Sequence, residues 1–194
     1  VKYQEKSCKS FYQEYPKLKD KRLVLYAPTF RDQEVGHPSL HLDLKKMAEC
    51  MPDDTALLLR LHPHVAESFA RDDWDDYDGK IYNMSEYPQV STLLFVAEQL
   101  ITDYSSIVFE YCVLERPMLF YAYDLADFRE DGRSFYENYE EYVPGPVCET
   151  EDELYQNLFE QYAKRREQAK AFKLTSYTWL DGEATKRLLD LLLL

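Results

Sequence analysis

Residues 100–110 form the first segment whose side chains could bind a ligand. The segment reads Leu-Ile-Thr-Asp-Tyr-Ser-Ser-Ile-Val-Phe-Glu, a pattern that predicts a short strand and then a helix beginning near Ser105. Free backbone N–H groups at the start of a helix attract an anion, and the hydroxyl groups of Ser105 and Ser106 would add donors. Alternatively, Asp103 or Ser105 serves only as a helix cap. The segment therefore predicts either a phosphate site or a structural cap.

Glu110 suggests that this site also holds a sugar. It lies four residues after Ser106, so the two side chains share one helix face, roughly 6 Å apart. The neighbouring residues are mostly apolar, and a carboxylate on a mostly buried helix costs free energy unless it has a partner. The two hydroxyl groups of a ribose would suit it, and a structural salt bridge with Arg or Lys would suit it equally well.

Arg60 and His62 end an earlier predicted strand and alternate with Leu61. They therefore share one face of that strand. Together they could bind a diphosphate, and His62 could donate a proton to a leaving phosphate. A histidine can also be purely structural, but one that ends a predicted central strand is a better candidate than an isolated one.

Thr29 and Arg31 follow the first predicted strand and offer a hydroxyl group and a guanidinium group on one side. Arg31 could instead pair only with Asp32 or Glu34. Donor side chains thus follow three strands that we expect to be neighbours, which is a stronger signal than any one of them. The candidate catalytic residue is His62, and the candidate substrate-binding residues are Thr29, Arg31, Arg60, Asp103, Ser105, Ser106 and Glu110.

Short strands that alternate with helices must position these side chains. Apolar runs predict strands at 22–27, 55–61, 80–82, 99–102 and 118–121. Helical spacing predicts helices near 42–51, 88–97 and 105–114, one from a capping box at Thr150 through Tyr162, and a last one from about Glu183. Residues 66–78 are acidic and read as a solvated helix and loop, and 124–149 read as irregular. This order predicts an α/β fold with a doubly wound parallel sheet, which binds ligands beyond the carboxyl ends of its strands.

Charge and composition exclude several classes of protein. The chain has 194 residues and a net charge of -13, and so acidic a protein does not favour nucleic-acid binding. The four cysteines lie far apart without a Cys-x-x-Cys pair, which predicts no zinc site and fits a reducing compartment. The acidic cluster around Asp72 and Asp75 lacks the spacing of a calcium loop. We therefore predict neither a metal nor a cofactor.

Several well-known motifs and targeting signals are missing from the sequence. It contains no P-loop, no Gly-x-Gly-x-x-Gly motif and no Gly-x-Ser-x-Gly motif, which disfavours P-loop, ordinary dinucleotide-binding and α/β-hydrolase functions. Charged residues interrupt any signal peptide, and no apolar run is long enough to span a bilayer. Because the chain begins without an initiator methionine and ends in four leucines, we expect it to be a piece of a longer protein.

Six short motifs in order resemble the CDP-glycerol glycerophosphotransferase family, the teichoic-acid primases and polymerases of bacterial cell walls. They are Leu25-Tyr-Ala-Pro-Thr-Phe-Arg-Asp32, Leu59-Arg-Leu-His-Pro63, Leu100-Ile-Thr-Asp-Tyr-Ser-Ser106, Arg116-Pro-Met-Leu-Phe-Tyr121, Pro144-Gly-Pro146 and Asp181-Gly182. The resemblance covers roughly residues 21–190.

The resemblance implies one half of a GT-B glycosyltransferase fold, in which two Rossmann-like domains face each other across a cleft. Residues 21–194 would be its C-terminal domain, which binds the nucleotide donor, and residues 1–20 would be a linker or lead-in helix. His62 would contact the donor phosphates, with Ser105 and Ser106 beneath the diphosphate. Glu110 would take the acidic ribose position, which is commonly Asp in this family.

The family reaction transfers glycerol phosphate, or ribitol phosphate in relatives, from a CDP-activated donor to an acceptor hydroxyl and releases CMP. The implied partners are CDP-glycerol or a similar donor, the missing N-terminal GT-B domain, and an acceptor polymer or lipid-linked primer. The full enzyme would be cytoplasmic and peripheral on the inner face of the membrane. This chain alone, without the acceptor site and the base on the other domain, would bind the donor but not turn it over.

One departure and two alternatives remain. Residues 130–136 differ from the family's usual Arg-Gly-Phe-Tyr stretch, which puts the role of Arg133 in doubt. The same fold could bind a UDP- or GDP-sugar as the donor domain of another GT-B glycosyltransferase. A non-catalytic module that docks a partner through some of the 17 tyrosines is the third hypothesis.

Overall fold

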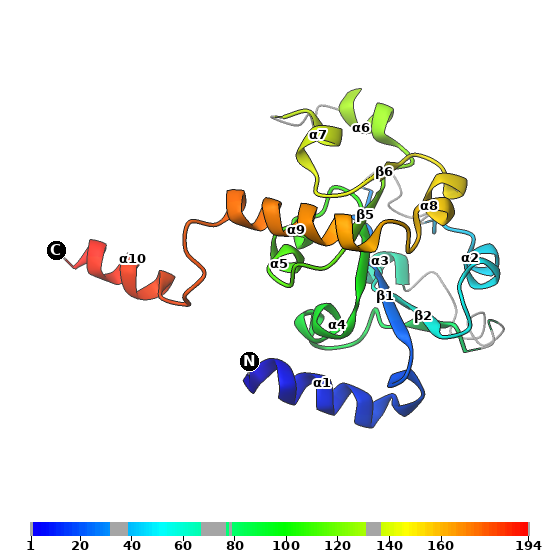
Figure 1. Cartoon of the computed structure of the whole chain (residues 1–194), viewed down its shortest axis with the longest axis horizontal. Helices are drawn as coiled ribbons and strands as arrows, with labels where there is room; N and C mark the ends of the chain where they lie inside the picture. Colours follow the sequence, from blue (N-terminus) through cyan, green and yellow to red (C-terminus); the bar gives the residue numbers. More distant parts are fainter. Residues whose placement is uncertain (1, 32–38, 67–76, 78, 131–136, 194) are drawn as a thin grey trace.

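A parallel sheet forms the centre of the protein. The computed structural model describes residues 2–31, 39–66, 77, 79–130 and 137–193. Within them six parallel strands lie in the order β3-β2-β1-β4-β5-β6 (Figure 1). The strands are β1 Arg22–Tyr26, β2 Thr55–Leu59, β3 Ile81–Asn83, β4 Gln99–Thr102, β5 Met118–Tyr121 and β6 Val147–Cys148. The five strands predicted from the sequence are confirmed to within two residues, and β6 was not predicted.

Helices cover both faces of this sheet. They are α1 Lys2–Glu14, α2 Leu44–Cys50, α3 Pro63–Ala66, α4 Val90–Val96, α5 Ile107–Cys112, α6 Leu125–Glu130, α7 Tyr139–Tyr142, α8 Glu151–Asn157, α9 Tyr162–Ser176 and α10 Ala184–Leu192, with a 3-10 turn η1 at Pro16–Leu18. Alternate residues of β1 enter different cores: Leu23 and Leu25 pack with α1, α4, α5 and α9, whereas Val24 and Tyr26 pack with α2, α3 and α8. The prediction of a doubly wound α/β sheet is therefore confirmed.

The helix predicted from Thr150 through Tyr162 is two helices. The capping box at Thr150 and Glu153 is confirmed, but α8 ends at Asn157 and α9 begins at Tyr162. Between them Phe159 and Gln161 have φ values of 66° and 49°, which no helix interior allows. The buried guanidinium group of Arg165, in the first turn of α9, reaches back and binds the backbone carbonyl of Asn157. Apolar spacing continues across this break, so periodicity alone did not reveal it.

The N-terminal helix is part of the packed structure. Phe11 of α1 is fully buried, and its ring meets that of Tyr87 at a centroid distance of 5.7 Å. The segment predicted as a linker or lead-in helix therefore contributes to the core that covers one face of the sheet.

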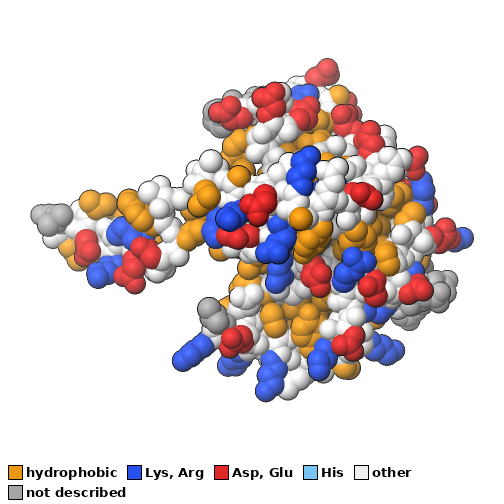
Figure 2. Space-filling view, viewed as in Figure 1, with side chains coloured by type: hydrophobic (Ala, Val, Ile, Leu, Met, Phe, Trp, Pro, Cys, Tyr) orange, Lys and Arg blue, Asp and Glu red, His pale blue; other side chains and the backbone are white. Residues whose placement is uncertain are grey.

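The C-terminal helix α10 projects away from the body of the protein, as Figures 1 and 2 show. Leu191 and Leu192 are 73% and 71% exposed. This helix confirms the one predicted from about Glu183. No helix in the described part of the chain has the length and apolar character needed to cross a membrane.

Candidate functional site

The order of the strands places a crevice between β1 and β4. From β1 the chain moves to β2 and β3 on one side, and it later adds β4, β5 and β6 on the other side. Loops that leave two neighbouring strands in opposite directions open a crevice at their carboxyl ends. An open cavity of about 640 Å³ lies there, within the usual size range of small-molecule sites. Its lining comes from the loops after β1, β2 and β4: Ala27, Pro28, Thr29, Phe30, Arg60, Leu61, His62, Pro63, Tyr104, Ser105, Ser106 and Ile107.

Five of the eight candidate residues thus meet at one cavity, because Thr29, Arg60, His62, Ser105 and Ser106 all line it. The three strand ends that carry them are neighbours in the sheet, as predicted. The chemical roles assigned to these residues stay predictions.

Arg60 contributes a positive charge to the cavity while it holds a loop behind it. Its Nη1 donates to the backbone carbonyls of Met84 at 3.0 Å, of Tyr87 at 2.9 Å and of Ser85. No carboxylate among the described residues forms an ion pair with it, and burial lowers the pKa of this arginine. A guanidinium group nevertheless stays charged in proteins. Its charge is therefore not neutralised by an acidic side chain of the described structure.

His62 immediately precedes α3 and lies against Phe30. Its backbone carbonyl accepts the N–H groups of Val65 and Ala66, both at 2.9 Å. Its ring stacks on the ring of Phe30, with centroids 4.8 Å apart and planes 25° apart. The side chain is exposed at the cavity. Local structure therefore holds the imidazole in position beside the space where a ligand would lie.

Ser105 and Ser106 stand where β4 leads into α5. The Oγ of Ser105 accepts the N–H of Ile107 at 3.3 Å, a weak local bond. Ser106 is exposed, and its hydroxyl makes no capping bond to the helix. Asp103 does not cap α5 either, because its carboxylate binds elsewhere. The hydroxyl group of Ser106 is therefore available to a ligand without loss of a helix cap.

Glu110 does not lie on a buried helix face, contrary to the prediction. The buried residues of α5 are Val108, Tyr111 and Cys112, whereas Glu110 is exposed. An exposed carboxylate is solvated by water, so burial does not demand a partner for it. It does not line the cavity, and no salt bridge joins it to an Arg or Lys in the described chain. Its role as a ribose ligand rests on the resemblance alone.

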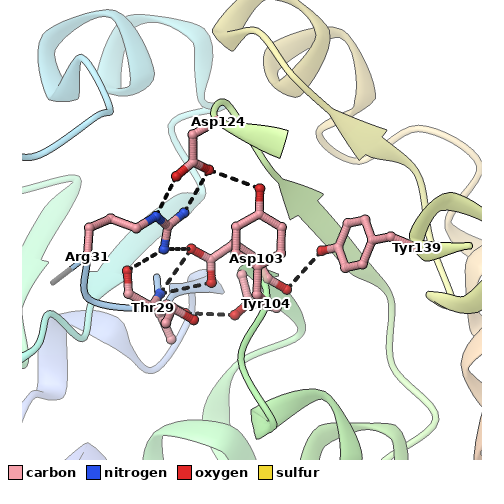
Figure 3. A network of polar contacts seen from close by, with 8 residues as sticks. Thr29, Arg31, Asp103, Tyr104, Asp124 and Tyr139 are labelled. Atoms are coloured by element: carbon pink, nitrogen blue, oxygen red, sulfur yellow. Dashed lines mark hydrogen bonds and ion pairs between the residues drawn. The ribbon is translucent and has the colours of Figure 1, made fainter. Parts of the chain in front are cut away.

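Arg31 and Asp103 lie behind the cavity rather than on its surface. Nη1 of Arg31 lies 2.8 Å from Oδ2 of Asp103, and its Nε lies 2.6 Å from Oδ2 of Asp124 (Figure 3). Its Nη2 binds the other oxygen of Asp124 at 3.0 Å. The side chain is 9% exposed, and that of Asp103 is 1% exposed. Two carboxylates therefore already bind the guanidinium group that was expected to bind substrate, and a substrate-binding role for Arg31 stays a prediction.

Asp103 is likewise engaged by protein groups, since it accepts the backbone N–H of Thr29 at 2.8 Å in addition to Arg31. The hydroxyl group of Thr29 is buried and has no hydrogen-bond partner among the described residues. The alternative partners considered for Arg31, Asp32 and Glu34, lie outside the described residues, as do Arg133 and most of the acidic stretch 66–78.

Aromatic side chains enclose these charges and complete what we call the Arg31 network: Arg31, Asp103, Asp124, Tyr104 and Tyr139. The Tyr104 hydroxyl donates to Oδ1 of Asp124 at 2.9 Å. The Tyr139 hydroxyl donates to the backbone carbonyl of Asp103, also at 2.9 Å. The guanidinium carbon lies 5.0 Å from the ring centre of Tyr104 and 5.2 Å from that of Tyr123. Such positions add cation–π attraction to the ion pairs.

Burial and Arg31 act in opposite directions on the two carboxylates. Burial raises the pKa of Asp103, although Arg31 and the Thr29 N–H oppose that shift. Burial also acts to raise the pKa of Asp124, but the hydrogen bonds and charge of Arg31 outweigh it and hold the pKa of Asp124 below its usual value.

Asp124 and Tyr139 were missed because residues 124–149 read as irregular. The search for polar side chains directly after each strand, applied to β5, would have found Asp124, since β5 is the neighbour of β4.

Within the described ranges, no group of three or more His, Cys, Asp or Glu side chains is arranged to hold a metal ion. All four cysteines are free thiols.

Comparisons of the sequence with a family model and with curated proteins point to the same family. A family model described as CDP-Glycerol:Poly(glycerophosphate) glycerophosphotransferase matches residues 1–194. Over 185 residues the chain is 36% identical to the teichoic acid poly(ribitol-phosphate) polymerase of Bacillus spizizenii, covering 92% of this chain and 29% of that protein. It is 32% identical to the teichoic acid glycerol-phosphate transferase of Staphylococcus aureus, covering 87% of this chain and 44% of that one. The chain thus spans less than half the length of these curated relatives.

Solved structures agree with the sequence comparison. A variant of the wall teichoic acid polymerase TagF matches with a TM-score of 0.81 and 30% identity, over 96% of this chain and 47% of that chain. A TagF variant soaked with CDPG matches with a TM-score of 0.80 over 96% of this chain and 46% of that chain. A putative UDP-N-acetylglucosamine 2-epimerase from Listeria monocytogenes, 19% identical with a TM-score of 0.51, shares the fold alone. The sheet and these neighbours support a GT-B-like fold.

Proposed function

Because the chain belongs to the CDP-Glycerol:Poly(glycerophosphate) glycerophosphotransferase family, we propose that it is the donor-binding domain of a transferase that uses CDP-glycerol or CDP-ribitol. In this proposal it forms the C-terminal half of a GT-B enzyme that extends teichoic acid or a related cell-surface polymer. The supporting observation is the cavity at the switch point of the sheet, where Arg60, His62 and Ser106 meet.

Each of these groups has a role that its chemistry allows. An acceptor hydroxyl attacks the β-phosphorus of the donor, a new O–P bond forms, and the bond from that phosphorus to the bridging oxygen breaks. CMP leaves with the electron pair of that bond, and His62 donates a proton to it. Arg60 and the serine hydroxyls stabilise the charge on the phosphoryl oxygens. The base that removes the acceptor proton belongs to the rest of the enzyme, so this chain alone binds donor without turnover.

The acceptor and the location follow from the same proposal. In this proposal the acceptor is a polymer or a lipid-linked primer, and the full enzyme works in the cytoplasm at the inner face of the membrane. Fractionation of cells that express the full-length enzyme tests this location, and recovery from the culture medium would contradict it.

Ligand binding by the purified chain tests the donor site. Titration calorimetry and thermal unfolding would compare CMP, CDP-glycerol, UMP and GMP. Ligand at 100 times its Kd adds about 2.7 kcal/mol of stability, which raises the Tm by about 5–11 °C in a chain of this size. We expect this for the cytidine ligands. A preference for UMP or GMP would favour a nucleotide-sugar transferase, and no shift at millimolar ligand with folded protein would refute the proposal.

Ser106→Ala is the cleanest variant for this test, because Ser106 is exposed and caps nothing. Loss of one hydrogen bond to a charged phosphate costs about 1.5–3 kcal/mol, or about 10- to 150-fold in Kd. Ser10→Ala, at an exposed position on α1, is the matched control and should leave the Kd unchanged. Equal affinities of the two variants would remove Ser106 from the site. Unchanged activity of a full-length His62→Ala enzyme would favour a docking module instead.

A further inference from the structure

Two walls of the cavity are attached to a single set of charges behind them. Thr29 and Tyr104 both line the cavity, on the loops that follow β1 and β4. The backbone N–H of Thr29 is bound by the carboxylate of Asp103 at 2.8 Å, and the hydroxyl group of Tyr104 is bound by the carboxylate of Asp124 at 2.9 Å. Arg31 joins these two carboxylates. The two walls are therefore connected through three side chains that do not line the cavity.

The geometry of Arg31 makes this connection stiff. Its Nε, Nη1 and Nη2 each have a partner, and Nη1 also donates to the backbone carbonyl of Thr29 at 2.7 Å. A planar guanidinium group bound by two oxygens of one carboxylate has a fixed direction, which a lysine could not reproduce. Three strand ends, those of β1, β4 and β5, are thereby held at fixed positions relative to one another.

Asp124 binds Tyr104 of one wall directly and is linked to the Thr29 wall through Arg31. Its two oxygens accept three hydrogen bonds, two from Arg31 and one from Tyr104. Its side chain is 18% exposed, and it comes from the start of α6 rather than from a cavity-lining loop. Phe128 of α6 also stacks on Tyr104, with ring centroids 3.8 Å apart. The segment after β5 thus supports the cavity without lining it.

We propose that Asp124 is a positioning residue of the donor site, which sets the separation of the Thr29 and Tyr104 walls through Arg31. The proposal rests on the proposed function for the identity of the ligand. Fixing the site in advance increases affinity because less order is lost when the ligand binds. Loss of Asp124 should therefore weaken binding of CMP and CDP-glycerol although no contact to them is removed.

Asp124→Asn tests this role. The amide keeps the size of the side chain but turns one acceptor into a donor facing a guanidinium group. The matched control is Glu115→Gln. It breaks another partly buried ion pair, 2.7 Å from Lys173, before the amino end of β5 and hence at the opposite edge of the sheet. We expect about a tenfold loss of CMP affinity in Asp124→Asn, and less than a twofold change in Glu115→Gln, both measured where each variant is fully folded.

Hydrogen exchange of the unliganded protein provides a second readout that needs no ligand. The amide of Thr29 should exchange about tenfold faster in Asp124→Asn than in wild type, and at the wild-type rate in Glu115→Gln. The positioning role would be overturned if Thr29 in Asp124→Asn exchanged at the wild-type rate. It would also be overturned if wild type bound CMP and Asp124→Asn bound it with the same affinity. If wild type binds neither CMP nor CDP-glycerol, the proposed function fails, and the exchange rates alone decide whether Asp124 fixes the two walls.

Discussion

Replacement of Arg31 by methionine should lower the stability of the protein, because the buried carboxylate of Asp103 loses its counter-ion. Methionine fills much of the same space but carries no charge, so Asp103 remains 1% exposed without a counter-ion. Removing one partner of a buried ion pair costs about 3–5 kcal/mol. In a domain of 150–250 residues each kcal/mol lowers the Tm by about 2–4 °C, so Arg31→Met should melt roughly 6–20 °C below wild type.

A second substitution tests whether the unpaired charge of Asp103 causes the loss of stability. In the Arg31→Met protein, Asp103→Asn removes the unpaired charge while its amide oxygen can still accept the Thr29 N–H. We therefore expect Asp103→Asn to restore about 1–3 kcal/mol in that background, although it destabilises wild type. The pair is thus predicted to be strongly coupled.

The effect of pH follows from the same charge. Burial raises the pKa of Asp103, and Arg31 opposes this in wild type; without Arg31 the folded-state pKa rises further above its unfolded value. A carboxyl group with a raised folded-state pKa binds its proton more tightly in the native protein, so stability increases as pH falls. The deficit of Arg31→Met should therefore be largest near pH 7.5 and smaller at pH 5.

Urea unfolding followed by circular dichroism at both pH values measures all four proteins of this cycle. The m-values should agree, so that shifts of the midpoint report stability. A deficit that does not change with pH, together with further loss when Asp103→Asn is added, would refute the buried-charge argument.

Two further predictions concern the packing of residues outside the cavity. Phe11→Ala should destabilise the chain by about 3–5 kcal/mol in urea unfolding, because Phe11 is 0% exposed; a loss below about 1 kcal/mol would mean that α1 is dispensable. Gly145→Ala should cost about 1–3 kcal/mol or more, because its Cβ would lie 2.2 Å from the backbone oxygen of Met118. Wild-type stability of Gly145→Ala would show that β5 shifts freely.

The elements of the fold were predictable wherever burial is complete. β1, β2, β4 and β5 are almost entirely buried, and each contains a continuous apolar run that the sequence shows. β6 has only two residues, Val147 and Cys148, too few for any periodicity. At the break between α8 and α9, Arg165 binds a carbonyl eight positions earlier, a polar contact that apolar spacing does not reveal.

The site was predictable as a set of strand ends but not as a set of contacts. Parallel strands bring their carboxyl ends to one edge, so Thr29, Arg60, His62 and Ser106 were placed at the cavity correctly. Contacts between residues far apart in the sequence decide which charged side chains face the cavity. Arg31 and Asp124, for example, are 93 positions apart. Alternation along a strand could not show that Arg31 turns away from the cavity.

The central place of β1 in the sheet also affects how the protein is made. On one side β1 pairs with β2, and on the other it pairs with β4, where Val24 lies opposite Gln99. At about 5–20 residues per second, a ribosome needs about 4–15 s to synthesise the intervening chain. During that time one edge of an apolar strand has no partner, a state that favours aggregation. We therefore expect co-expressed chaperones, which cover exposed apolar strands, to raise the yield of native protein.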